Sequence, residues 1–234
     1  MSTVVSKPGR SLTPPALTRM SRLWGSSVGQ KVIMAITGVV LSAFVLGHMA
    51  GNLQVFQGPE SINGYSKLLH REPALLWGAR IVLLTAVGLH IWAYLALTRI
   101  NQRARPKTYQ KTHHKESSFA SRSMRLTGPL LLAFIVFHIL HLTTGTVHPD
   151  YHEGDVYRNL ISGLSVVWVS AVYLLAMAML GFHLWHGVWS MCQTLGGNQP
   201  RYKSLGRKLA TVFTLVVVLG FAAVPLAILA RFVR

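Results

Sequence analysis

The sequence predicts an all-α membrane protein in which five transmembrane helices form a bundle. Of its 234 residues 51% are hydrophobic, yet the formal net charge is +17. A soluble domain seldom combines these properties, whereas a membrane protein places apolar spans in lipid and basic residues in short loops. The basic residues lie between the apolar runs rather than along one folded face, which argues against nucleic acid as a partner.

Five apolar runs are long enough to cross a hydrocarbon core of roughly 30 Å, which takes about 20 helical residues. We expect the spans near 32–56, 74–97, 126–147, 160–192 and 209–230. The fourth run exceeds a perpendicular span, so we expect it to tilt or to project from the membrane.

The domain organisation follows from these runs. Residues 29–234 are expected to form one transmembrane domain without an internal repeat. Residues 1–28 are basic and contain several Pro, Ser and Thr, which indicates a loosely ordered leader rather than a cleaved signal peptide.

The charge distribution predicts the orientation. Seventeen of the 23 Lys and Arg residues lie before the first span, between the second and third, or between the fourth and fifth. The positive-inside rule therefore places the N-terminus in the cytoplasm and the C-terminus outside. Five of the six acidic residues are then outside, and only Glu116 is inside.

Histidine placement is the main functional signal. Five of the eleven histidines are expected to be solvated in loops: His70, His113, His114, His148 and His152. The other six lie inside the first four spans: His48, His90, His138, His141, His183 and His186. An ionisable group at membrane depth is costly and usually faces the bundle interior. An interhelical hydrogen bond would explain any one of them, but four consecutive spans each supply at least one.

The helical rise of about 1.5 Å per residue sorts these histidines into two levels. His48 and the third-span histidines lie near the outer side, whereas His90 and His183 lie nearer the inner side. Two haems, each held by two imidazoles, would need this arrangement. Such haems transfer electrons and leave no open position on the iron. Depth slightly favours His141 over His138 as the partner of His48, but it does not decide either i, i+3 pair.

Small residues lie close to three of these histidines. Gly47 and Gly51 flank His48, and Gly88 and Gly181 precede His90 and His183 by two positions. They could give clearance to a flat macrocycle, although helix packing explains each one equally well. His141 and His186 could contact the haem beyond its iron ligands, relay a proton or simply pack.

Four segments together resemble a known family. They are "SSVGQKVIMAITGVVLSAFVLGHMAGNLQVFQGPESINGYSKLL", "GLHIWAYLALT", "FIVFHILHLTTG" and "GFHLWHGVWSMCQTLG". They look like the single-chain, di-haem cytochrome b subunit of bacterial succinate dehydrogenase and fumarate reductase. The similarity runs from about Ser26 to the C-terminus, and its first segment is the most specific.

The resemblance implies the iron ligands and their pairing. It implies that His48 and His138 hold an outer haem b, and that His90 and His183 hold an inner one. It also implies a bacterial plasma-membrane protein that anchors an FAD flavoprotein and an iron-sulfur protein on the cytoplasmic face. The haems would then carry electrons to or from a membrane quinone, for which we expect menaquinone.

The sequence contains no motif for dicarboxylate chemistry. It lacks a flavin fingerprint, and its single cysteine, Cys192, excludes both a disulfide and a thiolate-ligated iron-sulfur cluster within the chain. Succinate must therefore be oxidised elsewhere in the complex.

The expected quinone site lies at the inner end of the first span, where Ser27, Gln30 and Lys31 cluster. An outer site using Glu60 or His70 remains an alternative. Three other functions also remain open. They are a di-haem cytochrome b of another quinone-linked dehydrogenase or hydrogenase, a transporter with a histidine proton relay, and a haem-free anchor.

Overall fold

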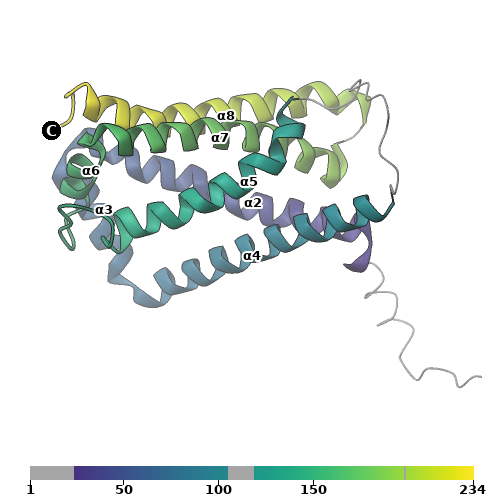
Figure 1. Cartoon of the computed structure of the whole chain (residues 1–234), viewed down its shortest axis with the longest axis horizontal. Helices are drawn as coiled ribbons and strands as arrows, with labels where there is room; N and C mark the ends of the chain where they lie inside the picture. Colours follow the sequence, from purple (N-terminus) through teal and green to yellow (C-terminus); the bar gives the residue numbers. More distant parts are fainter. Residues whose placement is uncertain (1–23, 105–118, 198) are drawn as a thin grey trace, which may run out of the picture.

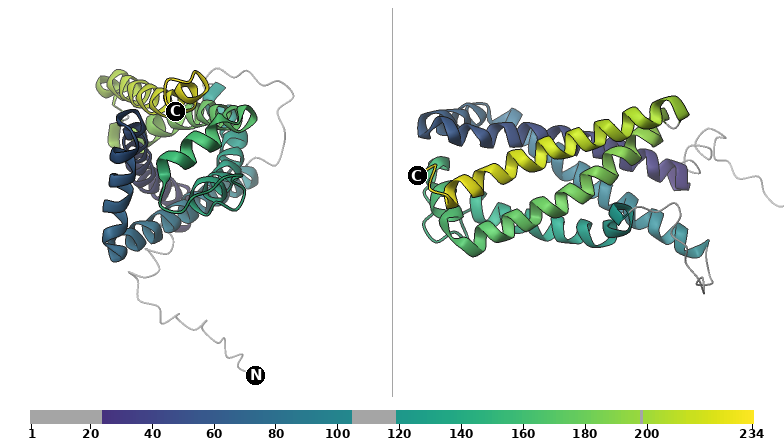
Figure 2. Two further views of the ribbon diagram at one scale, coloured as in Figure 1. Left: turned by 90° about the vertical axis from the view of Figure 1, so that its left-hand side faces the viewer. Right: turned by 90° about the horizontal axis from the view of Figure 1, so that it is seen from above.

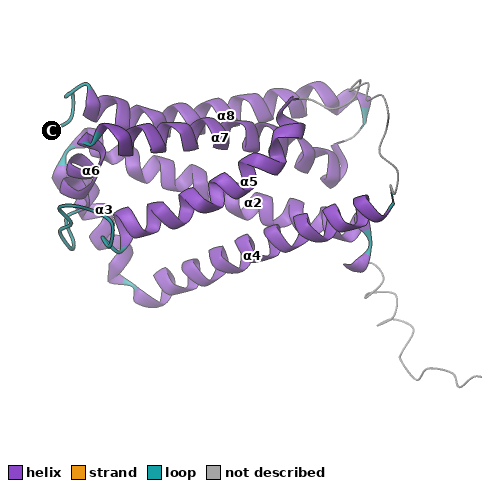
Figure 3. Ribbon diagram, viewed as in Figure 1, coloured by secondary structure: helices purple, strands orange, loops and turns teal. Residues whose placement is uncertain are grey.

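The computed structural model describes residues 24–104, 119–197 and 199–234. Within these ranges every regular element is helical (Figure 3). Most of the expected leader and much of the loop between the second and third spans, including His113, His114 and Glu116, lie outside the described residues.

Five long helices run side by side along the molecule (Figure 1). They are α2 (Ser27–Asn52), α4 (Pro73–Arg103), α5 (Phe119–His138), α7 (Val167–Cys192) and α8 (Pro200–Leu229). A 3-10 turn (Leu53–Gln57) extends α2, and π-helical turns (Ile139–Thr143 and Gln193–Gly197) extend α5 and α7. With these extensions, the described part of the chain contains five helices that are long and apolar enough to cross a membrane, which confirms the predicted fold class.

Two short helices, α3 (Pro59–Arg71) and α6 (Val156–Ser165), lie at one end of the bundle (Figure 1). The C-terminus lies at this same end, whereas α2 begins at the opposite end. We call the end with α3 and α6 the outer end, following the orientation expected from the charges, and the opposite end the inner end.

The expected fourth span, 160–192, is two helices instead of one. Val166 lies between α6 and α7 with φ −74° and ψ 111°, an extended conformation that ends the first helix. Apolarity could not reveal this break, because residues on both sides of it are hydrophobic. The other spans differ at their ends: α8 already begins at Pro200, where proline suits the first helical turn, and the third span ends near Thr143 instead of Val147.

The helices pack in a defined order. Helix α7 contacts α8 and α5, and α2 contacts α4, α7 and α8. Within the described residues, α2 with α5 and α4 with α7 are not closely packed pairs. Large apolar side chains on the outward faces are exposed, for example Leu84 on α4 at 71% and Leu219 on α8 at 64%. Such exposure suits contact with lipid.

A buried hydrophobic cluster lies at the outer end of the bundle, the end that faces the viewer in Figure 2, left. It joins Val55, Ile62, Leu164, Tyr173 and Ile228, from the α2 extension, α3, α6, α7 and α8 respectively. Each Å² of apolar surface removed from water stabilises the fold by about 25 cal/mol, and this burial is the main force that holds the outer end together.

Asn63 connects α3 to α6 by two hydrogen bonds. Its amide nitrogen donates to Asp155 Oδ1 at 3.0 Å, and its oxygen accepts from the Tyr157 N–H at 3.0 Å. Asp155 also caps α6 by accepting from the Arg158 N–H. The Arg158 N–H, followed by the Asn63 amide, stabilises the carboxylate and lowers the pKa of Asp155.

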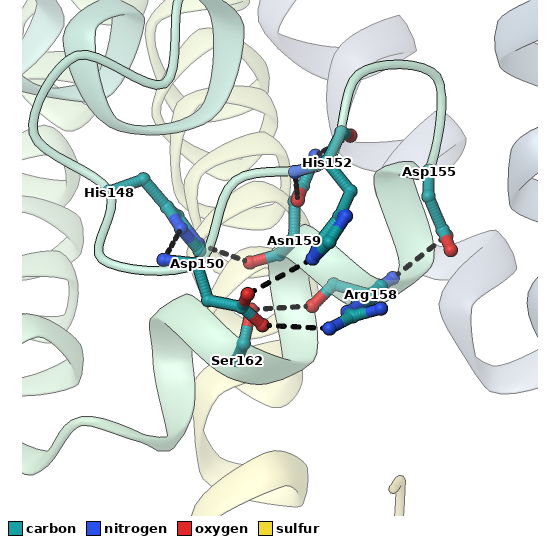
Figure 4. Close-up of polar contacts among 7 residues, drawn as sticks. All are labelled: His148, Asp150, His152, Asp155, Arg158, Asn159 and Ser162. Carbon is teal, nitrogen blue, oxygen red and sulfur yellow. Dashed lines mark hydrogen bonds and ion pairs between the residues drawn. The ribbon is translucent and has the colours of Figure 1, made fainter.

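The loop before α6 is ordered around Asn159 (Figure 4). The Asn159 side chain accepts from the His152 N–H and donates to the His152 carbonyl, both at 2.8 Å. His148 Nε2 bonds the Asn159 carbonyl at 3.0 Å, and His148 Nδ1 accepts from the Asp150 N–H. His148 is therefore buried, at 8% exposure, and not solvated as expected. His152 and Arg158 pair with Asp150 at the surface, and the hydrogen bond from His152, then that from Arg158, lowers the pKa of Asp150.

Candidate functional site

Two pairs of histidines face each other across the bundle. At the outer level His48 of α2 meets His138 of α5, with ring centroids 5.8 Å apart. At the inner level His90 of α4 meets His183 of α7, with ring centroids 6.2 Å apart. In each pair the imidazoles, rather than closely packed backbones, connect the two helices.

The separation of the two levels follows from α2. Thr37 of α2 lies beside His90, and His48 lies 11 residues further along the same helix. At about 1.5 Å per residue this places the two pairs about 16 Å apart along the helix. The sequence-based grouping of the histidines into two levels thus matches their arrangement.

A threonine lies beside each histidine of the inner pair. Thr37 Oγ1 is 3.0 Å from His90 Nδ1 and 2.8 Å from the Ile33 carbonyl. Because the hydroxyl has one proton and donates it to that carbonyl, its oxygen is free to accept from His90 Nδ1–H. Thr127 Oγ1 lies 3.5 Å from His183 Nδ1, a weaker version of the same contact. A proton on Nδ1 leaves the lone pair of Nε2 available to a metal.

Phenylalanines support the outer pair. Phe44, one turn before His48, stacks on it at 5.3 Å, and Phe134, one turn before His138, stacks on it at 5.8 Å. The Tyr173 hydroxyl lies 3.2 Å from His138 Nδ1. The ring planes of both ligand candidates are therefore fixed by neighbours from the protein.

The second histidine of each i, i+3 pair lies elsewhere. His141 is 1% exposed and stacks on His148 at 4.8 Å, away from His48. The π-helical turn that starts at Ile139 contributes to this, because its wider winding turns His141 away from the position that a regular helix would give it. His138, and not His141, is therefore the third-span histidine that meets His48. His183, and not His186, meets His90.

The glycines around His48 differ in their surroundings, and haem clearance by them stays a prediction. A Cβ on Gly51 would lie 2.7 Å from the Tyr65 ring, so this glycine makes room for α3. Gly47 is exposed, and a Cβ there would meet nothing within 4 Å. Gly38 instead lies against an inner-pair ring, because its Cβ would be 3.9 Å from His90 Cε1.

Of the three expected quinone residues, Gln30 alone is buried. It is 2% exposed, its Nε2 donates to the Trp24 carbonyl at 2.7 Å, and its Oε1 has no hydrogen-bond partner among the described residues. An orphaned buried acceptor is unusual and suits a ligand that donates. Ser27 and Lys31 are exposed at the same end, and Ser26 rather than Ser27 caps α2. At the other end of the bundle, Glu60 and His70 are exposed.

An internal repeat joins these features, contrary to the expectation of none. The stretches "TGVVLSAFVLGH" (37–48) and "TGPLLLAFIVFH" (127–138) agree at six of twelve positions, and "GLHIW" (88–92) and "GFHLW" (181–185) share the spacing Gly-x-His-x-Trp. The matched threonines, phenylalanines and histidines make corresponding contacts in the structure. Sequence reasoning missed the repeat because the positions between the matches differ, mostly among apolar residues.

The donor set fits a haem and does not fit a bare metal ion. Within the described residues no three or more His, Cys, Asp or Glu side chains are arranged to hold a metal ion. A haem iron needs only two protein ligands when the porphyrin supplies the other four, and each facing pair supplies two imidazoles. With Nδ1 of His90, His183 and His138 facing hydroxyl groups, Nε2 is the nitrogen that would bind an iron.

Comparison with known proteins supports a family assignment. The family model described as the succinate dehydrogenase/fumarate reductase transmembrane subunit matches residues 99–223, which include His138 and His183. No curated protein and no solved structure matches the chain.

Proposed function

The chain belongs to the succinate dehydrogenase/fumarate reductase transmembrane subunit family, and from this membership we propose that it is the di-haem cytochrome b anchor of such a complex. The observation that supports the proposal most directly is the pairing of four imidazoles from four helices at two levels. A multi-pass membrane subunit with this donor set is suited to passing electrons across the bilayer.

In this proposal His48 and His138 bind the outer haem b, and His90 and His183 bind the inner one. A haem b held by two imidazoles has low-spin iron that accepts and releases one electron without binding a substrate. The protein's part is to fix the rings. Thr37 and Thr127 hold the inner imidazoles through Nδ1, and Phe44 and Phe134 stack on the outer ones.

The partners are a flavoprotein that contains FAD and an iron-sulfur protein, and both dock on the basic inner face. The chain itself has neither the cysteines for an iron-sulfur cluster nor a flavin motif, so dicarboxylate chemistry takes place in those subunits. Electrons then pass between the iron-sulfur protein and a membrane quinone, expected to be menaquinone, in a bacterial plasma membrane.

The inner end of α2 supports a quinone site around Gln30. Its unpartnered Oε1 can accept a hydrogen bond from a quinol hydroxyl, and the exposed Lys31 and Ser27 lie on the same turn of helix. Binding a donor there would remove the cost of an unsatisfied buried acceptor, about 1–3 kcal/mol.

The test is haem content and its dependence on single histidines. The complex purified in mild detergent should contain two haems b per chain by the reduced pyridine haemochrome spectrum. Folded protein without haem, made with ample haem supply, would favour a haem-free anchor or a histidine proton relay. Copurification of another quinone-linked dehydrogenase or a hydrogenase would reassign the partner.

Alanine variants test the pairing. His90→Ala or His183→Ala should lose the inner haem and keep the outer one, and His48→Ala or His138→Ala should do the reverse. His141→Ala and His186→Ala are the matched controls, since neither meets the opposite histidine, and both should retain two haems. Loss of both haems from one ligand substitution in a folded, inserted protein would contradict the pairing.

A further inference from the structure

The Tyr173 hydroxyl lies between two histidines of the third span. It is 3.2 Å from His138 Nδ1 and 3.0 Å from His141 Nδ1, and Tyr173 is 8% exposed. The three side chains come from α5, its π-helical extension and α7, so the contact also joins two helices.

Because the Tyr173 hydroxyl has a single proton, it can donate to one of the two histidines and must accept from the other. A histidine that binds iron through Nε2 carries its proton on Nδ1, so His138 donates to the tyrosine oxygen. The hydroxyl then donates to His141 Nδ1, which must be an acceptor. His141 in turn carries its proton on Nε2, the buried atom that has no partner among the described residues.

The side chain of His141 is tightly packed. Its ring stacks on His148 at 4.8 Å and on Phe137 at 5.4 Å. A Cβ on Gly163 would lie 2.7 Å from both His141 Cε1 and His148 Nε2, so only glycine leaves room for both rings. His148 is itself held at both nitrogens. His141 is therefore a rigid acceptor for the tyrosine.

This arrangement is confined to the second repeat. The positions in the first repeat that correspond to His141 and Tyr173 are Gly51 and Arg80. The neighbours of the His48 ring in the described residues are aromatic, with Phe44 stacked on one side and Phe221 tilted at 5.8 Å. The two outer imidazoles thus have unlike surroundings.

We propose that Tyr173, oriented by His141, is a positioning residue that holds His138 by Nδ1 and lowers the reduction potential of the outer haem. The inference rests on the proposed function. A hydrogen bond donated from Nδ1 makes the imidazole a stronger electron donor to iron, which stabilises the ferric state. Removing the acceptor should therefore raise the potential of the outer haem alone.

The experiment is a potentiometric titration of both haems in the intact complex carrying Tyr173→Phe, which keeps the ring and removes the hydroxyl. We expect the ferric-to-ferrous equilibrium of the outer haem to shift about tenfold, a rise of about 59 mV for one electron, with the inner haem unchanged. Tyr157→Phe is the matched control. It removes a hydroxyl at the same end of the bundle whose one hydrogen bond among the described residues is to the Arg234 carbonyl, and neither potential should move.

Each outcome has a defined meaning. An unchanged outer potential overturns the proposal, and so does an equal shift of both haems, which would report a general structural change. If Tyr173→Phe cannot retain the outer haem, His141→Ala gives the measurement, because the hydroxyl then lacks its acceptor. The outer potential should rise by a smaller amount, and no rise overturns the proposal. A wild-type complex without haem would instead contradict the proposed function itself.

Discussion

At the scale of single residues, hydroxyl groups contact Nδ1 of three of the four facing imidazoles, His90, His138 and His183. Thr37 donates to the backbone of its own helix and so can only accept from His90. A threonine that bonds its preceding turn is usually explained as a helix residue satisfying itself. In this protein the same hydroxyl also lies 3.0 Å from His90 Nδ1 on another helix, so the local bond favours the His90 tautomer with its proton on Nδ1.

Thr37→Val should therefore lower the affinity of the protein for the inner haem. Valine has nearly the shape of threonine but cannot accept from Nδ1, and loss of such a contact typically costs about 10–100-fold in affinity. Haem titration of the purified complex should show weaker inner-haem binding with the outer haem unaffected. Thr127→Val should have a smaller effect, since its contact is longer, at 3.5 Å against 3.0 Å.

Thr211→Val is the control for these variants. Thr211 also bonds its own helix, and it accepts from Trp185 instead of a histidine. Equal haem loss in Thr37→Val and Thr211→Val would mean that the threonines act on helix packing and not on the ligand.

The residue scale also shows what the sequence could predict. Polarity at membrane depth singled out the six histidines of the first four spans, because an imidazole in lipid needs a partner, and the choice of His183 over His186 came from the family resemblance. The preference of depth for His141 was wrong about which third-span histidine meets His48, since the π-helical turn after His138 is a matter of backbone winding that composition does not encode. The burial of His148 was missed for a similar reason, because its partners are backbone groups.

At the scale of elements, the repeat explains why the facing histidines fall into two pairs. Each repeat is a helix with a Thr and a His 11 residues apart, followed by a helix with one His. Each facing pair combines one histidine from each repeat, so in the proposed function each haem would take one ligand from each repeat. This corresponds to parallel repeats related by an axis along the membrane normal.

Helices α3 and α6 depend on a polar connection that apolar patterning could not predict. Asp155 caps α6 and also accepts from Asn63 of α3. Asp155→Ala removes both bonds, and loss of an N-cap costs about 1 kcal/mol. The variant should lower the thermal unfolding temperature of the detergent-solubilised protein, whereas Asp155→Asn should keep most of the stability, because asparagine caps helices nearly as well. Equal melting of the two variants would show that the cap contributes little.

At the scale of the whole molecule, the two ends of the bundle differ in construction. The outer end has ordered short helices, a buried apolar cluster and most of the described acidic residues. The inner end has exposed basic residues, among them Lys31, Arg201 and Lys203. This asymmetry agrees with the proposal that the partner subunits dock at the basic inner end, whereas the outer end is covered by the protein's own short helices.

The expected orientation can be tested with single cysteines. In a Cys192→Ser background, which removes the one native thiol, Glu153→Cys places a thiol in the exposed loop at the outer end and Lys203→Cys places one at the inner end. Because basic residues remain on the cytoplasmic side, a membrane-impermeant maleimide should label the first variant in intact cells. It should label the second only after the cells are permeabilised. The reverse labelling pattern would show that the bundle has the opposite orientation in the membrane. The iron-sulfur partner would then have to dock beside the outer histidine pair instead of the inner pair.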